Sequence, residues 1–192
     1  MNITKFFRLS LGRWRSQRTG HHLEQSHFED VRSTVDVTLL ELDDPRVVRG
    51  CRDCGIDPDS ATLPYQIDWY DSRTRGLQID RLSRSLVIPV PNPDNANLGK
   101  LIQLALEPDA IVSIGEYQLS QDGTFTVISS QDTVTREERI WFATPNLRLH
   151  VSIIRPSDAS VTTTTFTSDL RVLTPAKPKA EAVSTAFDEM RR

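Results

Sequence analysis

Alternation of apolar and polar residues with a period of two is the strongest pattern in this chain of 192 residues. Val31, Val35 and Leu39 share one face of an extended segment, whereas Arg32 and Asp36 share the other. Such alternation predicts antiparallel strands with one buried face. Similar patterns predict strands over residues 13–23, 31–39, 65–70, 86–90, 99–106, 117–119, 125–127, 133–142, 147–154 and 162–173, about ten in all.

No strand–helix–strand repeat separates these segments, so we expect a meander, and closure into a barrel removes its exposed edges. The sequence therefore predicts a mainly β fold, an antiparallel lipocalin-like (fatty-acid-binding-protein-like) barrel with one or two short helices. Such a barrel has room for one small ligand. We expect a single domain over residues 1–173 and a flexible C-terminal tail over residues 174–192, which are rich in Ala, Pro and Lys.

Capping residues place the two short helices. Thr4 is expected to cap the first helix, which Gly12 ends. Asp44 is expected to cap the second, with Pro45 at its first position and Gly55 at its end. Elsewhere, the pair Asp122-Gly123 between two strand-like runs predicts a two-residue hairpin turn.

The charge balance restricts the classes of function. Lys and Arg number 23 against 26 Asp and Glu, which disfavours a protein that binds duplex nucleic acid. No apolar run approaches the roughly 20 residues of a membrane span, and the first residues lack a secretory signal, so we expect a cytoplasmic location. Nineteen of the 23 basic residues are Arg, which suits an anionic small ligand, although a GC-rich genome produces the same bias.

Two motifs are weak candidates for chemistry. Cys51 and Cys54 form a CxxC pair without a second ligand pair or a thioredoxin-like context, so we interpret them as incidental thiols. His21 and His22 are neighbours on a predicted strand and point to opposite faces, so a structural role is favoured for either.

Charged and aromatic residues of the later strands are more informative. Glu138 and Arg148 lie on two strands joined by a tight connection, and we expect them to face the same side if the hairpin pairs symmetrically. Asp169 and Arg171 share a face of the next strand. All three Trp residues fall within strands, where they can form core or wall a flat conjugated ligand: Trp14, Trp69 and Trp141.

Three strings carry a resemblance to a known family. They are GRWRSQRTGHHL (Gly12–Leu23, preceded by Phe6-Phe7), EERIWFATPNLRL (Glu137–Leu149) and TTFTSDLR (Thr164–Arg171). Together they resemble the S-type phycobiliprotein lyases, the CpcS/CpeS family, from residue 3 to about residue 173.

The sequence departs from the family pattern at three positions. The family more often has Ser at Gly20, Arg at His150 and Glu at Asp169. Asp keeps the charge of Glu but shortens its reach, so a role for Asp169 is less secure than one for Glu138.

The resemblance implies a bilin lyase. Such an enzyme binds a free linear tetrapyrrole, phycocyanobilin or phycoerythrobilin, and attaches it by a thioether bond to the central-site cysteine of a phycobiliprotein subunit. The acceptor is phycocyanin, allophycocyanin or phycoerythrin, and it supplies the nucleophilic thiol. The resemblance implies that no metal or other cofactor is needed. It also implies a homodimer, or a heterodimer with a related subunit.

The same resemblance assigns site residues. Glu138, with Asp169 second, is the catalytic candidate, because a carboxylate accepts hydrogen bonds from pyrrole N–H groups and favours the protonated, more electrophilic bilin. Arg18 and Arg148 match the family motif and suit the propionates of the bilin. The remaining predicted bilin-binding residues are His21, Trp69 and Trp141.

Two other functions stay open. The first is a non-catalytic partner subunit that stabilises a true lyase and shares the same strings. The second is a carrier of another apolar acid, such as a fatty acid.

Overall fold

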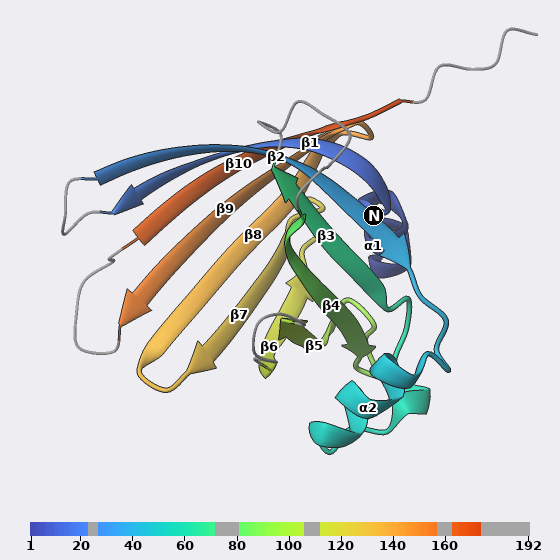
Figure 1. Cartoon of the computed structure of the whole chain (residues 1–192). Helices are drawn as coiled ribbons and strands as arrows, with labels where there is room; N and C mark the ends of the chain where they lie inside the picture. The colour runs from blue at the N-terminus through green and yellow to red at the C-terminus, as the bar shows by residue number, and fades with distance from the viewer. Residues whose placement is uncertain (23–26, 72–80, 106–111, 157–162, 174–192) are drawn as a thin grey trace, which may run out of the picture.

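The computed structural model describes residues 1–22, 27–71, 81–105, 112–156 and 163–173. Its ten strands follow one another around a closed antiparallel barrel (Figure 1), and β1 (Gly12–His22) closes the ring by pairing with β10 (Thr163–Arg171). The predicted lipocalin-like meander is confirmed, whereas the predicted tail lies outside the described residues. The other strands are β2 (His27–Leu39), β3 (Tyr65–Asp71), β4 (Arg81–Pro91), β5 (Leu98–Ala105), β6 (Val112–Leu119), β7 (Phe125–Gln131), β8 (Val134–Thr144) and β9 (Leu147–Pro156).

Helix α1 (Ile3–Ser10) fills one end of the barrel with aromatic side chains. Phe6 and Phe7 are 2% and 1% exposed, and the Phe6 ring stacks on Phe125 with 4.7 Å between the ring centroids. The N-cap is Asn2, whose side chain accepts a hydrogen bond from a backbone N–H of the first turn. The prediction of Thr4 as the cap was therefore wrong by two residues, because the neighbouring Asn offers a better acceptor.

A second, smaller core lies outside the barrel. Helix α2 (Pro45–Asp53) begins after its N-cap Asp44, as predicted, and a short 3-10 turn (Pro58–Ser60) follows it. The helix buries Val47 and Cys51 against the outer side of β4 and β5. Both described α-helices are too short and polar to cross a membrane.

The connection between β6 and β7 differs from the predicted two-residue turn. The backbone N–H of Ser120 donates to the carbonyl of Thr124 at 2.9 Å, and the N–H of Gly123 donates to the carbonyl of Ser120 at 3.0 Å. Gly123 has a φ of +87°, whereas its predecessor Asp122 does not share this left-handed conformation. A two-residue hairpin loop of the expected type requires a positive φ at both central positions, so the chain adopts a three-residue loop instead.

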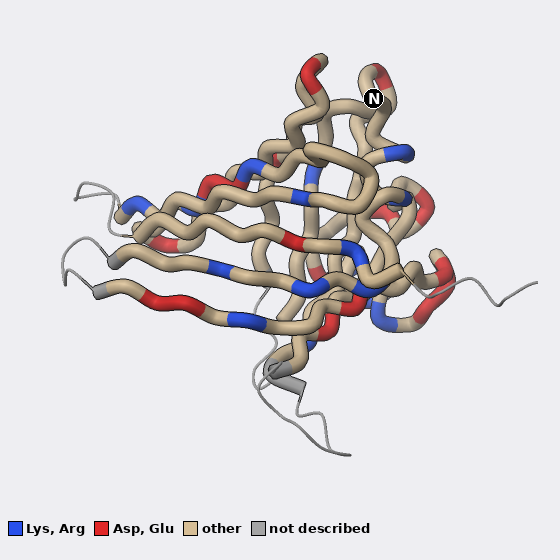
Figure 2. The backbone as a smooth tube through the Cα atoms, turned by 90° about the horizontal axis from the view of Figure 1, so that it is seen from above, with Lys and Arg blue, Asp and Glu red and all other residues tan. Residues whose placement is uncertain are grey.

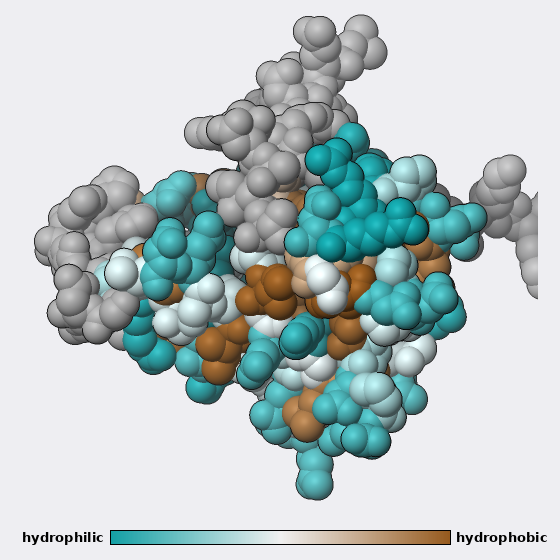
Figure 3. All heavy atoms as spheres, turned by 90° about the horizontal axis from the view of Figure 1, so that it is seen from below, coloured by the Kyte–Doolittle hydropathy of each residue, from teal (hydrophilic) through white to brown (hydrophobic). Residues whose placement is uncertain are grey.

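Charged and exposed hydrophobic residues both lie on the surface of the barrel (Figure 2 and Figure 3). The long strands β1, β2, β9 and β10 extend away from α1 (Figure 1), and both acidic and basic residues lie along the strands seen from above (Figure 2). Seen from below, hydrophobic side chains gather near the centre of the surface between hydrophilic borders (Figure 3). The exposed apolar residues of the outer sheet face include Leu98, Ile114 and Ile128. A ligand inside the barrel can meet only those charged residues whose side chains point to the inner face of the strands.

The aromatic plug gives a prediction about stability. Phe6→Ala removes a buried ring that stacks on Phe125, and we expect it to lower the free energy of unfolding by about 3–5 kcal/mol. Phe166→Ala, at a ring that is 44% exposed, is the matched control and should cost less than about 1 kcal/mol. Urea unfolding followed by fluorescence measures both, and equal losses would contradict the assignment of α1 as a core element.

Candidate functional site

The alternation along β1 decides which of its side chains face the interior. Trp14 and Ser16 are buried, and Trp14 belongs to the main core of the barrel. Arg18 shares their face because successive side chains of a strand alternate. Arg15, between them, is exposed and points outward. The structure therefore turns Arg18 inward.

A buried ion pair links β9 to β10. Arg148 and Asp169 lie directly opposite each other in the strand register. The Nε and Nη2 atoms of Arg148 donate to Oδ2 of Asp169 at 3.0 and 2.8 Å. The two side chains are only 9% and 3% exposed. Because unpaired buried charges are very costly, these two groups depend on each other.

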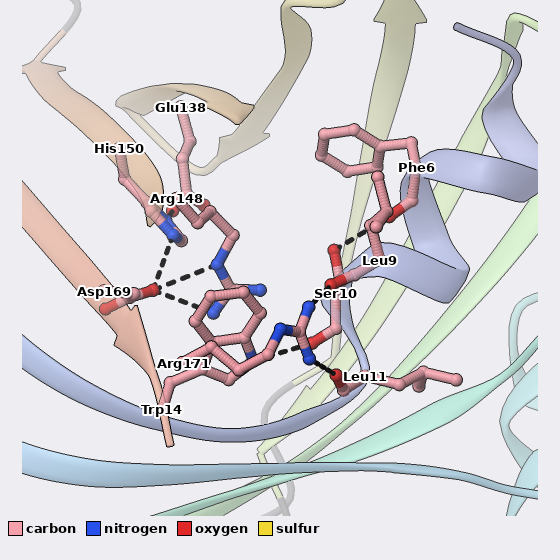
Figure 4. A network of polar contacts seen from close by, with 10 residues as sticks. All are labelled: Phe6, Leu9, Ser10, Leu11, Trp14, Glu138, Arg148, His150, Asp169 and Arg171. Atoms are coloured by element: carbon pink, nitrogen blue, oxygen red, sulfur yellow. Dashed lines mark hydrogen bonds and ion pairs between the residues drawn. The ribbon is translucent and has the colours of Figure 1, made fainter. Parts of the chain in front are cut away.

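His150 joins this pair to a second carboxylate. Its Nε2 lies 2.9 Å from Oδ2 of Asp169, and its Nδ1 lies 3.3 Å from Oε1 of Glu138 (Figure 4). Burial alone would lower the pKa of His150, but the two neighbouring carboxylates outweigh it and raise the pKa above its ordinary value. Since each ring nitrogen faces an acceptor, the imidazolium form fits this position.

The two carboxylates are held in their ionised forms. Burial by itself would raise the pKa of both groups. For Asp169, the adjacent His150 and the charge of Arg148 outweigh burial and hold the pKa well below its usual value. For Glu138, the pKa is lowered by His150, with smaller effects of Arg136 and Arg148. The inner face thus carries two carboxylates beside two cations.

Trp14 and Arg171 anchor this network to helix α1 (Figure 4). The guanidinium carbons of Arg148 and Arg171 lie 4.7 and 4.1 Å from the centroid of the Trp14 ring. Arg171 also donates to the carbonyl oxygens of Leu9 and Leu11 at the end of the helix, at 2.6 and 2.7 Å. A cation at a helix C-terminus is favourable, so the plug of the barrel and the charged site hold each other in place.

Arg18 and Glu138 are the more accessible charged members of the inner face. Arg18 is paired with Thr167 of β10 in the register, and its side chain is 50% exposed. Its nearest acidic partner is Glu29, at 3.9 Å. The side chain of Glu138 is 26% exposed, far more than that of Asp169. Arg18 can therefore meet an anionic group of a ligand, and Glu138 can meet a hydrogen-bond donor.

The hairpin of β8 and β9 brings Glu138 and Arg148 to the same face, as expected, but not by symmetric pairing. The register pairs Phe142 with Arg148 and shifts between Phe142 and Thr144. This irregularity is what places both charged residues inside. Trp69 of β3 also faces inward, half-buried against the main core.

Two predicted bilin-binding residues lie on the outer face, which corrects the sequence prediction. His21 is exposed, with its ring 5.3 Å from that of Phe28. Trp141 lies between the inward-facing Ile140 and Phe142 and lines a surface depression beside Met1. Both are three positions from an inward-facing charged residue, and residues an odd number apart on a strand point to opposite faces. Neither can line the interior of the barrel.

The cysteines do not form a reactive site. Cys51 lies on the buried face of α2, and Cys54 is the C-cap of this helix. Burial raises the pKa of both thiols, which disfavours the thiolate needed for redox or metal chemistry. Within the described ranges, no cluster of three or more His, Cys, Asp or Glu residues is placed to hold a metal ion.

His150 is the site residue that sequence reasoning missed. It appeared only as a departure from the family pattern, although its position carried a signal. It is two residues from Arg148 on the same strand, so it had to share the inner face with Arg148. Its pairing with both carboxylates depends on the registers of β8, β9 and β10, which no single segment reveals.

Comparisons with known proteins agree with this geometry. The chain is 37% identical over 172 residues to chromophore lyase CpcS/CpeS 3 of Trichodesmium erythraeum. The aligned region covers 89% of this chain and 99% of the relative. It is 30% identical over 171 residues to the phycocyanobilin lyase subunit CpcS of Picosynechococcus sp., covering 88% of this chain and 86% of that one.

Structure and family comparisons point the same way. The solved structure of the S-type phycobiliprotein lyase CpeS from Guillardia theta superposes with a TM-score of 0.73 at 29% identity, over 91% of this chain and 94% of that one. The family model described as CpeS-like protein matches residues 2–172. The family predicted from the three sequence strings, and with it the assignment as a lyase, is confirmed. The chain belongs to the CpeS-like family.

Proposed function

We propose that this lyase binds a linear tetrapyrrole inside the barrel and attaches it by a thioether bond to a cysteine of a phycobiliprotein subunit. The observation that carries the proposal is the network of Glu138, His150, Asp169 and Arg148 on the inner face. A bilin offers several pyrrole N–H donors along one edge, and ionised carboxylates are the acceptors that such donors need. The names of the relatives support a chromophore as the ligand.

The remaining inner residues suit the other parts of the ligand. The half-exposed guanidinium of Arg18 is suited to a propionate, because Arg pairs with carboxylates through two parallel hydrogen bonds. Arg148 is already engaged by Asp169 and Trp14, so it acts mainly by keeping Asp169 ionised. Trp69 offers an apolar wall from the opposite side of the barrel.

The gain in this mechanism comes from position and charge rather than from a protein nucleophile. A carboxylate that accepts hydrogen bonds from the pyrrole N–H groups stabilises the cationic bilin, which is the better electrophile for a thiol. The acceptor subunit supplies the thiol. Holding the bilin in one orientation selects one face and one carbon for attack.

Phycocyanobilin is the first ligand to test, because one relative is named a phycocyanobilin lyase subunit. The purified chain is incubated with phycocyanobilin and an apo-phycocyanin subunit, and covalent product is measured by acid-stable absorbance on the denatured acceptor. Product above the level without the chain supports the proposal. Binding without transfer, also when phycoerythrobilin and other acceptors are supplied, would instead indicate a partner subunit that requires a related chain. No binding of either bilin, with tight binding of a fatty acid, would indicate a carrier.

Glu138→Gln tests the carboxylate. We expect the variant to bind bilin with a blue-shifted long-wavelength band and to transfer it about tenfold more slowly, because a charge-assisted hydrogen bond is lost. Glu137→Gln, at the outward-facing neighbour that pairs with Arg139 and Arg155, is the matched control. Full-rate transfer by the Glu138 variant would exclude this role.

Arg18→Gln tests the propionate contact. The expected loss is a two- to fivefold increase in the bilin Kd, roughly the value of a partly exposed ion pair. Arg15→Gln changes the same residue type on the outer face and should leave the Kd unaltered. Absorbance titrations measure both constants, and equal effects of the two substitutions would contradict the assignment.

A further inference from the structure

The two ring nitrogens of His150 are held unequally. Nε2 lies 2.9 Å from Asp169, a carboxylate that is 3% exposed and fixed by two hydrogen bonds from Arg148. Nδ1 lies 3.3 Å from Glu138, which is 26% exposed. Of the two contacts, only the one at Nδ1 has hydrogen-bond geometry, and among the described residues Nε2 is buried without a hydrogen-bond partner. The proton on Nδ1 thus faces the carboxylate that a ligand can reach.

The charges around His150 come from three strands. Glu138 and Arg136 lie on β8, Arg148 lies beside it on β9, and Asp169 lies on β10. These contacts link four groups: the cations Arg148 and His150 and the carboxylates Glu138 and Asp169. Their summed formal charge is zero. Burial raises the pKa of Tyr65, on which the charges of Arg148 and Glu138 have opposite effects. The Tyr65 hydroxyl therefore stays neutral.

This balance constrains how a bilin becomes a cation inside the barrel. A neutral bilin has one ring nitrogen without a hydrogen, and protonation of that nitrogen adds one positive charge. If the proton came from solution, the buried site would gain a net charge, which is costly away from water. If the proton came from within the network, the total charge would not change.

Resting on the function proposed above, we propose that His150 is the source of this proton. On binding, the Nδ1–H bond of His150 breaks, the proton passes to the carboxylate of Glu138, and from there it forms the N–H bond of the bilin cation. His150 is left as the neutral tautomer with its proton on Nε2, beside Asp169. Glu138 is ionised again at the end, now beside the cationic bilin, and Asp169 stays ionised throughout.

Asp169 is unsuited to the relay, and Glu138 is suited to it. Asp169 is shielded from solvent and held by Arg148, and its pKa lies well below the usual value. Glu138 has only His150 as a hydrogen-bonded partner among the contacts described here, and it is the more exposed of the two. His150 therefore acts through Glu138 and need not touch the ligand.

The test is a count of protons taken up when the chain binds phycocyanobilin at pH 7.5. Calorimetric titrations in two buffers of different ionisation enthalpy give the count, and absorbance gives the protonation state of the bound bilin. We expect a red-shifted, cationic band with almost no uptake of protons from solution. His150→Arg keeps the positive charge but has no proton to release, so its bilin should either stay neutral or take up about one proton from solution.

Controls separate the possible failures. His21→Gln, at the exposed outer-face histidine, should behave as the unmodified chain. His150→Gln, checked for folding by circular dichroism, should show the same change as His150→Arg. A cationic band with uptake of about one proton in the unmodified chain would overturn the inference while leaving the proposed function intact. A cationic band in both the unmodified chain and His150→Arg, with equal proton counts, would overturn it as well. The absence of any spectral change on adding bilin would overturn the proposed function itself.

Discussion

The ion pair between Arg148 and Asp169 is the interaction on which the rest of the site depends. Both charges are almost fully removed from water, so removing either would leave an uncompensated buried charge. Their contacts extend in two directions. Arg148 rests on Trp14, which is fixed to helix α1, and Asp169 contacts His150, which in turn meets Glu138. One pair thus connects the aromatic plug at the end of the barrel to the accessible carboxylate of its inner face.

The fold explains how so many charges come together on one face of the sheet. Strands β8, β9 and β10 are consecutive antiparallel neighbours, so inward residues of each lie within reach of the next. The aromatic side chains of α1 fill one end and leave the polar, accessible groups toward the other. A rigid, closed sheet is a good support for a site whose chemistry relies on position and charge. The proposed transfer needs no nucleophile of this chain, which agrees with the raised pKa of both thiols.

Period-two alternation was enough to predict the barrel and its strands, whereas the inward direction of Glu138, Asp169 and Arg18 came from the structure. The same rule, applied across residues, would also have excluded His21 and Trp141, which lie an odd number of positions from Arg18 and Glu138. The contacts of His150 could not be predicted from the sequence, because they depend on the registers of three strands and on the irregularity after Phe142. Sequence alternation fixes the face of a side chain, whereas its partners are decided by neighbouring strands.

The most direct test of the account is a crystal structure of the chain with phycocyanobilin bound. We expect the pyrrole nitrogens to lie within hydrogen-bond distance of the Glu138 carboxylate on the inner face, with a propionate at Arg18 and Asp169 still paired with Arg148. A bilin seated on the outer face, against Trp141 or His21, or bound inside without contact to Glu138, would contradict it.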